Sequence, residues 1–150
     1  MNLNQETVSF EIEMLKTGPM QFTTTFDKDF PDLLFDEPKH GGGEDKYPNA
    51  TRILTASISN CLLASLSFCI AKTRIEIPDF TLKSKVSCTT ARNEQGRWRI
   101  KEINVQIFPG SENHKDSLRQ ALDRCKNKFS DYCVVSESVR KGFDINFEIV

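Results

Sequence analysis

The chain has 150 residues, with 20 basic and 21 acidic side chains and a formal net charge of −1 at pH 7. A chain of this length usually forms one domain with a sizeable core, so we expect a single domain over residues 1–150. The charges are balanced and form no long run of one sign, which argues against nucleic acid and the membrane surface as partners.

The N-terminal segment and the cysteine content indicate the compartment. Residues 1–15, MNLNQETVSFEIEML, lack the basic start and the unbroken apolar run of a secretory signal, so we expect a cytoplasmic protein. The 5 cysteines are dispersed without a CxxC pair, and there are only 2 histidines. We therefore expect no zinc framework, no other metal and no cofactor. In a reducing compartment, thiols that form disulfides usually do so transiently and in catalysis.

Strand patterns and one long loop fill the first third of the chain. Residues 8–15 alternate apolar and polar side chains, as a half-buried strand does, and residues 21–26 are rich in β-branched and aromatic residues. Residues 32–35, DLLF, predict a third short strand. The glycine-rich segment 36–49, DEPKHGGGEDKYPN, predicts a loop, and both a functional role and an ordinary crossover remain open for it.

A long helix is predicted from Thr51 to Lys72. Asn49 or Thr51 can cap its start, and Pro78 follows its end. No charged residue lies between Ile53 and Ala71, and a helix without a charged face is buried on most sides. In so small a chain this implies a partner subunit, which we infer to be a second copy. The helix is long enough to span a membrane, but its hydroxyl and amide side chains make it too polar for lipid.

The remaining segments predict a hairpin, a helix and a last strand. Residues 80–92 and 97–108 form two strands joined by the turn NEQG, and a shift of the apolar phase predicts a bulge near Lys101 and Glu102. An amphipathic helix is expected over 111–129, with Ser111 able to cap it. Residues 131–139 predict an irregular or extended piece, and 142–150 predict a final strand. The order βββ-α-ββ-α-β is an α+β architecture.

The cysteines divide by their position in this pattern. Cys88 and Cys125 follow the apolar faces of their strand and helix, which indicates packing. Cys61 and Cys69 would lie about 12 Å apart along one helix, beyond the roughly 7 Å Cα limit of a disulfide, so they cannot bond to each other. Cys61 stays open between a core residue and a reactive thiol, because its neighbours Ser57, Ser59, Asn60 and Ser65 need partners when buried, and a thiolate or a ligand could be one. Cys69 is predicted to pack. Cys133 follows a helix end, where a thiol is more accessible.

Three phrases together resemble the OsmC/Ohr family of osmotically induced and organic hydroperoxide resistance proteins. They are DEP at 36–38, GGGEDKYPNAT at 41–51 before the long helix with Cys61, and DYCVVS at 131–136. The resemblance runs from about Thr7 to Val150. It implies an OsmC-like fold and an intertwined homodimer with the long helices at the interface. It also implies that Cys61 attacks an organic hydroperoxide, that the resulting sulfenic acid condenses with Cys133, and that an external dithiol reduces the disulfide.

Two features that the family peroxidases carry are missing here. They place a glutamate at the start of the long helix and an arginine in the N-terminal strands, whereas this chain has Thr51 and Arg52 and no earlier arginine. Thr51 and Arg52 are the candidate supporting residues, although a straight helix turns Arg52 about 180° away from Cys61. Two functions therefore stay open. One is a Cys61 and Cys133 peroxidase, and the other is a non-peroxidatic dimer that binds a small apolar ligand or senses thiol redox state.

Overall fold

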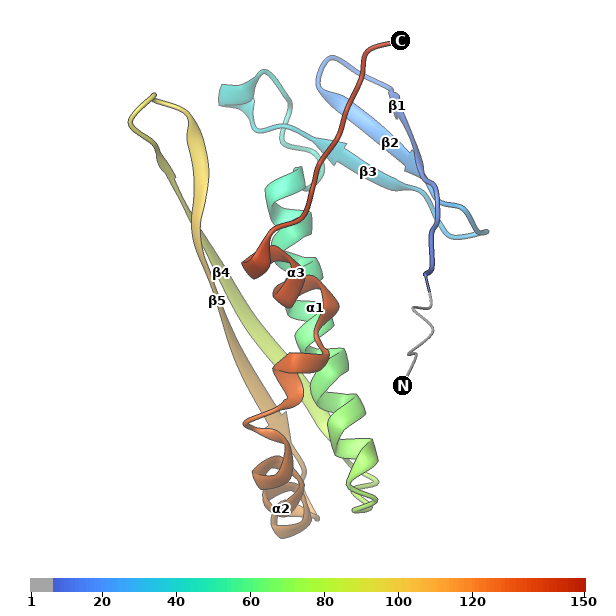
Figure 1. Ribbon diagram of the computed structural model, residues 1–150, viewed down its shortest axis with the longest axis vertical. Coiled ribbons are helices and arrows are strands. Elements are labelled where there is room, and N and C mark those ends of the chain that lie inside the picture. The colour runs from blue at the N-terminus through green and yellow to red at the C-terminus, as the bar shows by residue number, and fades with distance from the viewer. Residues whose placement is uncertain (1–6) are drawn as a thin grey trace. The chain divides into compact units, whose positions relative to one another are not determined.

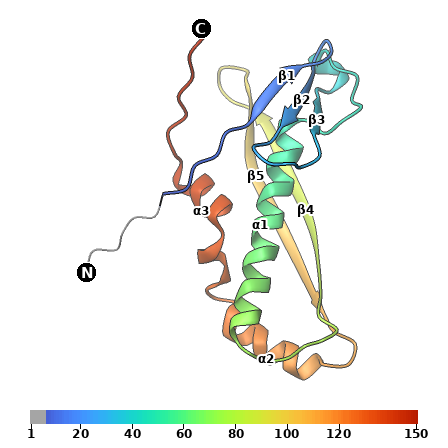
Figure 2. The same ribbon diagram turned by 90° about the vertical axis from the view of Figure 1, so that its right-hand side faces the viewer.

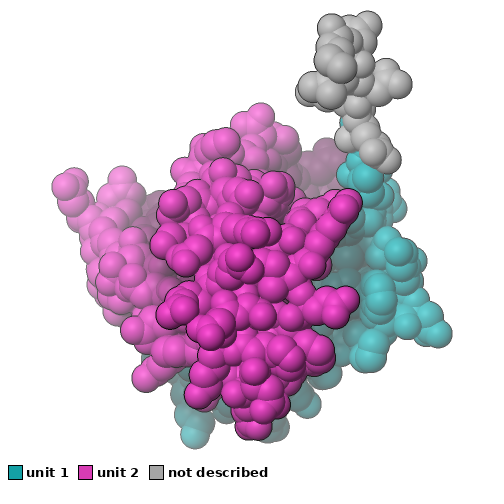
Figure 3. Space-filling view, turned by 90° about the horizontal axis from the view of Figure 1, so that it is seen from below, with its two compact units in different colours: residues 1–53 teal, residues 54–150 magenta. Residues whose placement is uncertain are grey.

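A computed structural model describes residues 7–150, and the chain divides into two units, residues 1–53 and 54–150 (Figure 3). Residues 1–6 begin the segment in which no secretory signal is predicted, and they lie outside the described residues. The observed order is three strands, a long helix, two strands and two further helices, an α+β fold as predicted (Figure 1). The single domain over 1–150 stays a prediction.

An antiparallel sheet in the order β1-β2-β3 forms the first unit. Its strands are β1 (Glu13–Lys16), β2 (Gln21–Thr25) and β3 (Leu33–Asp36). The prediction that the first strand starts at Val8 is wrong. The ladder begins only where Glu13 pairs with Thr25, and Val8 is 82% exposed. Residues 8–12 pair with no strand among the described residues, so their apolar side chains remain uncovered.

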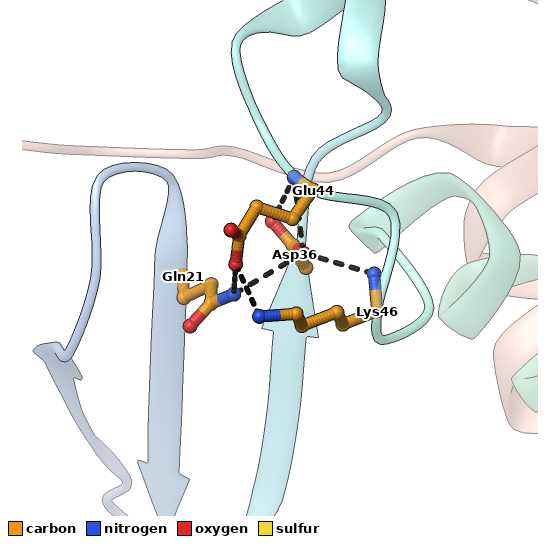
Figure 4. A network of polar contacts seen from close by, with 4 residues as sticks. All are labelled: Gln21, Asp36, Glu44 and Lys46. Carbon is orange, nitrogen blue, oxygen red and sulfur yellow. Dashed lines mark hydrogen bonds and ion pairs between the residues drawn. The ribbon is translucent and has the colours of Figure 1, made fainter.

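Asp36 fixes the glycine-rich loop, which contains the short helix η1 (Lys39–Gly41). Its carboxylate is 1% exposed and accepts hydrogen bonds from the backbone N–H of Lys46 (3.0 Å), the backbone N–H of Glu44 (3.2 Å) and Nε2 of Gln21 (3.3 Å) (Figure 4). The Lys46 N–H, with help from Glu44 and Gln21, outweighs burial and lowers the pKa of Asp36. The phrase DEP therefore anchors the loop that follows it.

The predicted long helix is confirmed as α1 (Ala50–Lys72). Asn49 caps it, because its Oδ1 accepts a hydrogen bond from the Arg52 N–H at 3.2 Å. In the second unit one side of α1 is buried, and its exposed side carries no charge between residues 54 and 71, before the exposed Lys72 at the helix end. That exposed side consists of Ala56, Ser57, Asn60, Ala64, Phe68 and Ala71. By length and composition α1 would also suffice to cross a membrane, a property that it shares with the core helices of soluble proteins.

A long hairpin of β4 (Thr81–Arg92) and β5 (Trp98–Gly110) packs against α1 (Figure 2). Ser59 on the helix and Ser84 on β4 share a hydrogen bond of 2.8 Å. The predicted bulge is confirmed, because Thr89 pairs with Glu102 and Thr90 pairs with Ile100, which leaves Lys101 as the extra residue.

Three helical segments follow the hairpin in the second unit: α2 (Lys115–Cys125), η2 (Phe129–Tyr132) and α3 (Val134–Lys141). The predicted amphipathic helix is α2, and the short helix η2 follows it. The core of this unit lies between the end of α1 and α2. Its buried members are Leu66, Cys69, Ile70, Ala121 and Cys125.

The C-terminal segment differs from its prediction. Residues Val134–Lys141 form the helix α3, not an irregular or extended piece, because Cys133 caps them and Glu137 and Arg140 suit the helix dipole. The predicted final strand over 142–150 is also wrong: this segment pairs with no strand, and Ile149 is 98% exposed. Its alternating pattern has no partner strand among the described residues.

Candidate active site: a pair of thiols

The structure brings the two candidate cysteines together. Cys61 lies on α1, Cys133 caps α3, and their thiols share a hydrogen bond. Both residues belong to the second unit, and α3 runs beside α1 in both views (Figure 1, Figure 2). The prediction of an accessible thiol at Cys133 is wrong, because Cys133 caps a helix and is fully buried, while Cys61 is partly exposed. The two sulfurs are therefore close enough to form a disulfide when they are oxidised. An outside reagent reaches Cys61 more easily than Cys133.

The N-terminus of α3 surrounds the thiol pair with hydrogen-bond donors. Cys133 Sγ accepts a hydrogen bond from the Ser136 N–H at 3.4 Å, and the N–H groups of Val135 and Val134 favour the Cys61 thiolate. These groups carry the positive end of the helix dipole, which stabilises negative charge on either sulfur. The Ser136 hydroxyl also favours the Cys133 thiolate, although its buried oxygen meets no partner at hydrogen-bond geometry.

The surroundings shift the pKa values of the two thiols in opposite directions. Burial, together with the hydrogen bond to Cys133, raises the pKa of Cys61. Burial alone would also raise the pKa of Cys133, but the hydrogen bonds from Cys61 and Ser136 outweigh it, so its pKa is lowered. Of the two thiols, Cys133 is therefore the one whose ionised form the surroundings favour.

Arg52 and Thr51 lie in the other unit, at the start of α1. The Arg52 guanidinium pairs with Asp45 at 3.8 Å, and both side chains are more than a third exposed. Among the described residues, the groups that most strongly shift the pKa of Cys61 are the Cys133 side chain and the N–H groups of Val134 and Val135, and Arg52 is not one of them. A supporting role for Thr51 or Arg52 stays a prediction.

The polar residues of α1 near Cys61 have partners of their own. The Ser65 hydroxyl donates to the Cys61 carbonyl at 2.8 Å, and Ser59 shares its hydrogen bond with Ser84. The sequence left open that these buried hydroxyls serve a thiolate or a ligand. Both instead satisfy backbone or neighbouring side-chain groups.

A cavity of about 510 Å³ lies beside the thiol pair, within the second unit. Helix α1 contributes Leu54, Ile58 and Leu62 to its wall, and the bulged part of β5 contributes a second apolar side. Ser136 also borders the cavity, so the residue that donates to the Cys133 sulfur forms part of its wall. The charged residues Lys101, Glu102 and Arg140 also line the cavity. The cavity suits an apolar group that carries a polar end.

The sequence missed a disulfide bond between Cys69 and Cys125. Both residues lie in the core, as predicted, but they are bonded to each other, with their Cα atoms 5.9 Å apart. Cys88 has a free thiol on the half-buried face of β4. The sequence repeats a spacing of eight residues, from Cys61 to Cys69 and from Cys125 to Cys133, but this repeat alone does not bring the two segments together. Among residues 7–150, no cluster of three or more His, Cys, Asp or Glu side chains is arranged to hold a metal ion.

The sequence comparison decides the family. Residues 43–148 match the sequence model of the family described as OsmC-like protein. The chain belongs to this family. The matched segment of this OsmC-like chain contains both thiols of the pair and both cysteines of the disulfide. No curated protein sequence matches it.

Solved structures share the fold of this OsmC-like chain at low sequence identity. An OsmC-like protein from Mycoplasma pneumoniae has a TM-score of 0.66 and 19% identity, and the match covers 90% of this chain and 89% of that one. An organic hydroperoxide resistance protein from Elizabethkingia anophelis, with thiocyanate bound, has a TM-score of 0.63 and 18% identity, with 91% of each chain covered. A third, from Legionella pneumophila, is described as an organic hydroperoxide resistance protein OsmC; its TM-score is 0.61 at 17% identity, with 91% and 92% covered.

Proposed function

We propose that this OsmC-like protein is a thiol-dependent peroxidase that reduces organic hydroperoxides through Cys61 and Cys133. The observation that carries the proposal is the hydrogen bond between the two thiols at the N-terminus of α3. The apolar cavity beside them supports an organic substrate. The fold shared with hydroperoxide resistance proteins from Elizabethkingia anophelis and Legionella pneumophila agrees with this reading.

In this mechanism Cys133 takes the proton that Cys61 must lose. The Cys61 sulfur attacks the distal oxygen of the hydroperoxide, its proton passes to the Cys133 thiolate, and the O–O bond breaks. The alkoxide leaves and is protonated by water to the alcohol, and Cys61 becomes a sulfenic acid. The neighbouring Cys133 thiolate thus serves as the base for Cys61.

The second step closes the disulfide. Cys133 gives up its proton and attacks the Cys61 sulfur, and the S–O bond breaks. The leaving hydroxide combines with that proton to form water, so two thiols and one hydroperoxide give one disulfide, one alcohol and one water. An external dithiol then reduces the Cys61–Cys133 disulfide by exchange, and the partly exposed Cys61 is the accessible point of attack.

The protein acts as a cytoplasmic homodimer.

Turnover of cumene hydroperoxide with a dithiol reductant tests the proposal. The wild-type protein and a Cys88→Ser control should consume the peroxide at similar rates, because Cys88 belongs to neither cysteine pair. Cys61→Ser should reduce the rate to that of the uncatalysed reaction. Equal rates for wild type and Cys61→Ser would exclude the mechanism.

A second candidate function is a binding or thiol-sensing protein without peroxide turnover. The observation that favours it is the raised pKa of Cys61, because a thiol that resists ionisation reacts slowly with peroxide. The cavity would then hold a small apolar ligand. Native mass spectrometry of the freshly purified protein would detect such a ligand. Fast peroxide turnover by a ligand-free protein would reject this alternative.

A further inference from the structure

Two sulfur-sulfur connections join the same two segments of the chain. Residues 61–69 of α1 lie against residues 125–133, and we call this contact the cysteine seam. Cys61 meets Cys133 at one end, and Cys69 is bonded to Cys125 at the other. The segments run in opposite directions, because the first cysteine of one meets the last cysteine of the other, and the spacing is eight residues in each.

Aromatic contacts fill the cysteine seam between the two connections. The ring of Tyr132 packs edge-on against that of Phe68, with the ring centroids 5.6 Å apart. Phe129 packs against the core cluster that contains Cys69 and Cys125. The segment that ends in Cys133 is therefore held along α1 by one covalent bond and two ring contacts.

The disulfide end of the seam is shielded, whereas the thiol end is open. Cys69 is 4% exposed and Cys125 is 0% exposed, so an external dithiol cannot reach their sulfurs in the folded protein. Cys61 is partly exposed. The two connections thus differ in access, and only the Cys61 and Cys133 pair is open to repeated oxidation and reduction.

We propose that the Cys69–Cys125 disulfide positions Cys133 for the resolving step, which makes Cys69 and Cys125 positioning residues of the reaction. The proposal rests on the peroxidase function. Only seven residues separate Cys125 from Cys133, so fixing Cys125 restricts where the Cys133 sulfur can go. Reaction between two held groups is sensitive to displacements of about 1 Å, which can change a rate about 100-fold.

The disulfide forms by exchange with a soluble disulfide while the chain folds and both sulfurs are still accessible. One of the two thiolates attacks the soluble disulfide, forms a mixed disulfide and releases one thiol. The second thiolate attacks the protein sulfur of the mixed disulfide and releases the other thiol. The cysteine pair loses two electrons and two protons, and the soluble disulfide gains both.

Thiol counting tests whether the second disulfide exists in the protein. Alkylation of the denatured, unreduced wild-type protein should label three cysteines, and labelling after reduction should reach all five. Peptide mapping should link Cys69 to Cys125. Five labelled cysteines without reduction would overturn the proposal.

Closure of the Cys61–Cys133 disulfide by diamide tests the positioning role without using peroxide. In a Cys69→Ala/Cys125→Ala variant, closure should slow by about tenfold or more, while a Cys88→Ala control should close at the wild-type rate. Cys69→Val/Cys125→Ala refills the lost volume and keeps the test available if the first variant does not fold. Unchanged closure in the folded variant would overturn the proposal.

A parallel experiment with hydroperoxide distinguishes failure of the positioning role from failure of the peroxidase function. With cumene hydroperoxide and dimedone, the double variant should carry more dimedone on Cys61 than wild type does, because its sulfenic acid waits longer for Cys133. If diamide closure slows but hydroperoxide oxidises neither protein, the positioning role holds and the peroxidase function fails. If hydroperoxide oxidises both proteins and closes both disulfides equally fast, the peroxidase function holds and the positioning role fails.

Discussion

At the scale of single residues, the reactivity of the site depends on which of two sulfurs, Cys61 or Cys133, carries the negative charge. The N–H of Ser136 and the thiol of Cys61 both donate to the Cys133 sulfur, and this lowers the pKa of Cys133 despite full burial. A thiolate at the cap of α3 is also stabilised by the helix dipole. In the proposed mechanism Cys133 therefore acts twice, first as the base for Cys61 and then as the resolving thiol.

Cys133→Ser should separate these two actions. Serine can still cap α3, but its hydroxyl is a poor base at neutral pH and cannot form a disulfide. We expect Cys61 to oxidise about tenfold more slowly than in wild type and then to stay trappable by dimedone. Mass spectrometry after peroxide treatment measures both effects. A disulfide from Cys61 to any other cysteine within the monomer would contradict the assignment of Cys133 as the resolving thiol.

We expect the stability of the protein to depend on pH through Asp79. It accepts hydrogen bonds from the Ser111 hydroxyl at 2.6 Å and from the Asn113 N–H at 2.7 Å, and these contacts lower its pKa. Since the folded pKa lies below the unfolded value of about 3.9, the stabilisation is present above about pH 4 and is lost as the pH falls through the folded pKa. Asp79→Asn should lower Tm at pH 7, and the deficit should shrink in strongly acidic buffer.

Thermal denaturation from pH 7 to pH 2 checks the prediction for Asp79. Asp116→Asn is the matched control, because Asp116 lies near the same turn but its side chain is 92% exposed. A surface pair of this kind contributes little to stability. A Tm deficit for Asp79→Asn that does not change with pH would contradict the account.

At the scale of elements, the cap residues explain both the agreement and the differences with the sequence. Helix α1 was predictable because Asn49 caps an unbroken apolar run, and the β5 bulge at Lys101 was predictable from the shift of its apolar phase. Helix α3 was not predicted, because its cap is Cys133 and cysteine is not among the preferred cap residues. The Cys69–Cys125 bond was missed because spacing along the chain gives no distance between α1 and α2.

The glycine-rich loop gives a test at this scale. A Cβ at position 43 would collide with the Glu37 carbonyl and lie 2.6 Å from an Asp36 carboxylate oxygen. At Gly41 the nearest atom would lie 3.7 Å away, an ordinary contact. Gly43→Ala should therefore destabilise the fold by about 1–3 kcal/mol, whereas Gly41→Ala should have little effect. Chemical denaturation of the two variants compares them, and equal stabilities would contradict the packing of this loop.

At the scale of the whole molecule, apolar groups remain uncovered in the single chain. Between residues 54 and 71 the exposed face of α1 carries no charge, and the tail 142–150 exposes apolar side chains at alternate positions. Exposed apolar surface of this kind marks an interaction site. The sequence predicted a second copy of the chain from the same uncharged helix, and the homodimer stays a prediction of this account.

A charge placed on the exposed face of α1 tests the homodimer. Light scattering should give the wild-type protein twice the chain mass of 17.1 kDa. Ala64→Arg should shift the protein toward the monomer, because an unpaired charge buried in an interface is costly. Gln95→Arg in the β4–β5 turn is the control and should leave the mass unchanged. A monomeric wild-type protein would contradict the prediction.

A disulfide map of the protein after one equivalent of organic hydroperoxide tests the roles of Cys61 and Cys133 most directly. We expect a Cys61–Cys133 disulfide that is absent before treatment and disappears with a dithiol, while Cys88 stays a free thiol. Cys69 and Cys125 should be linked before, during and after the cycle. An unoxidised Cys61 and Cys133 pair after treatment would contradict the account.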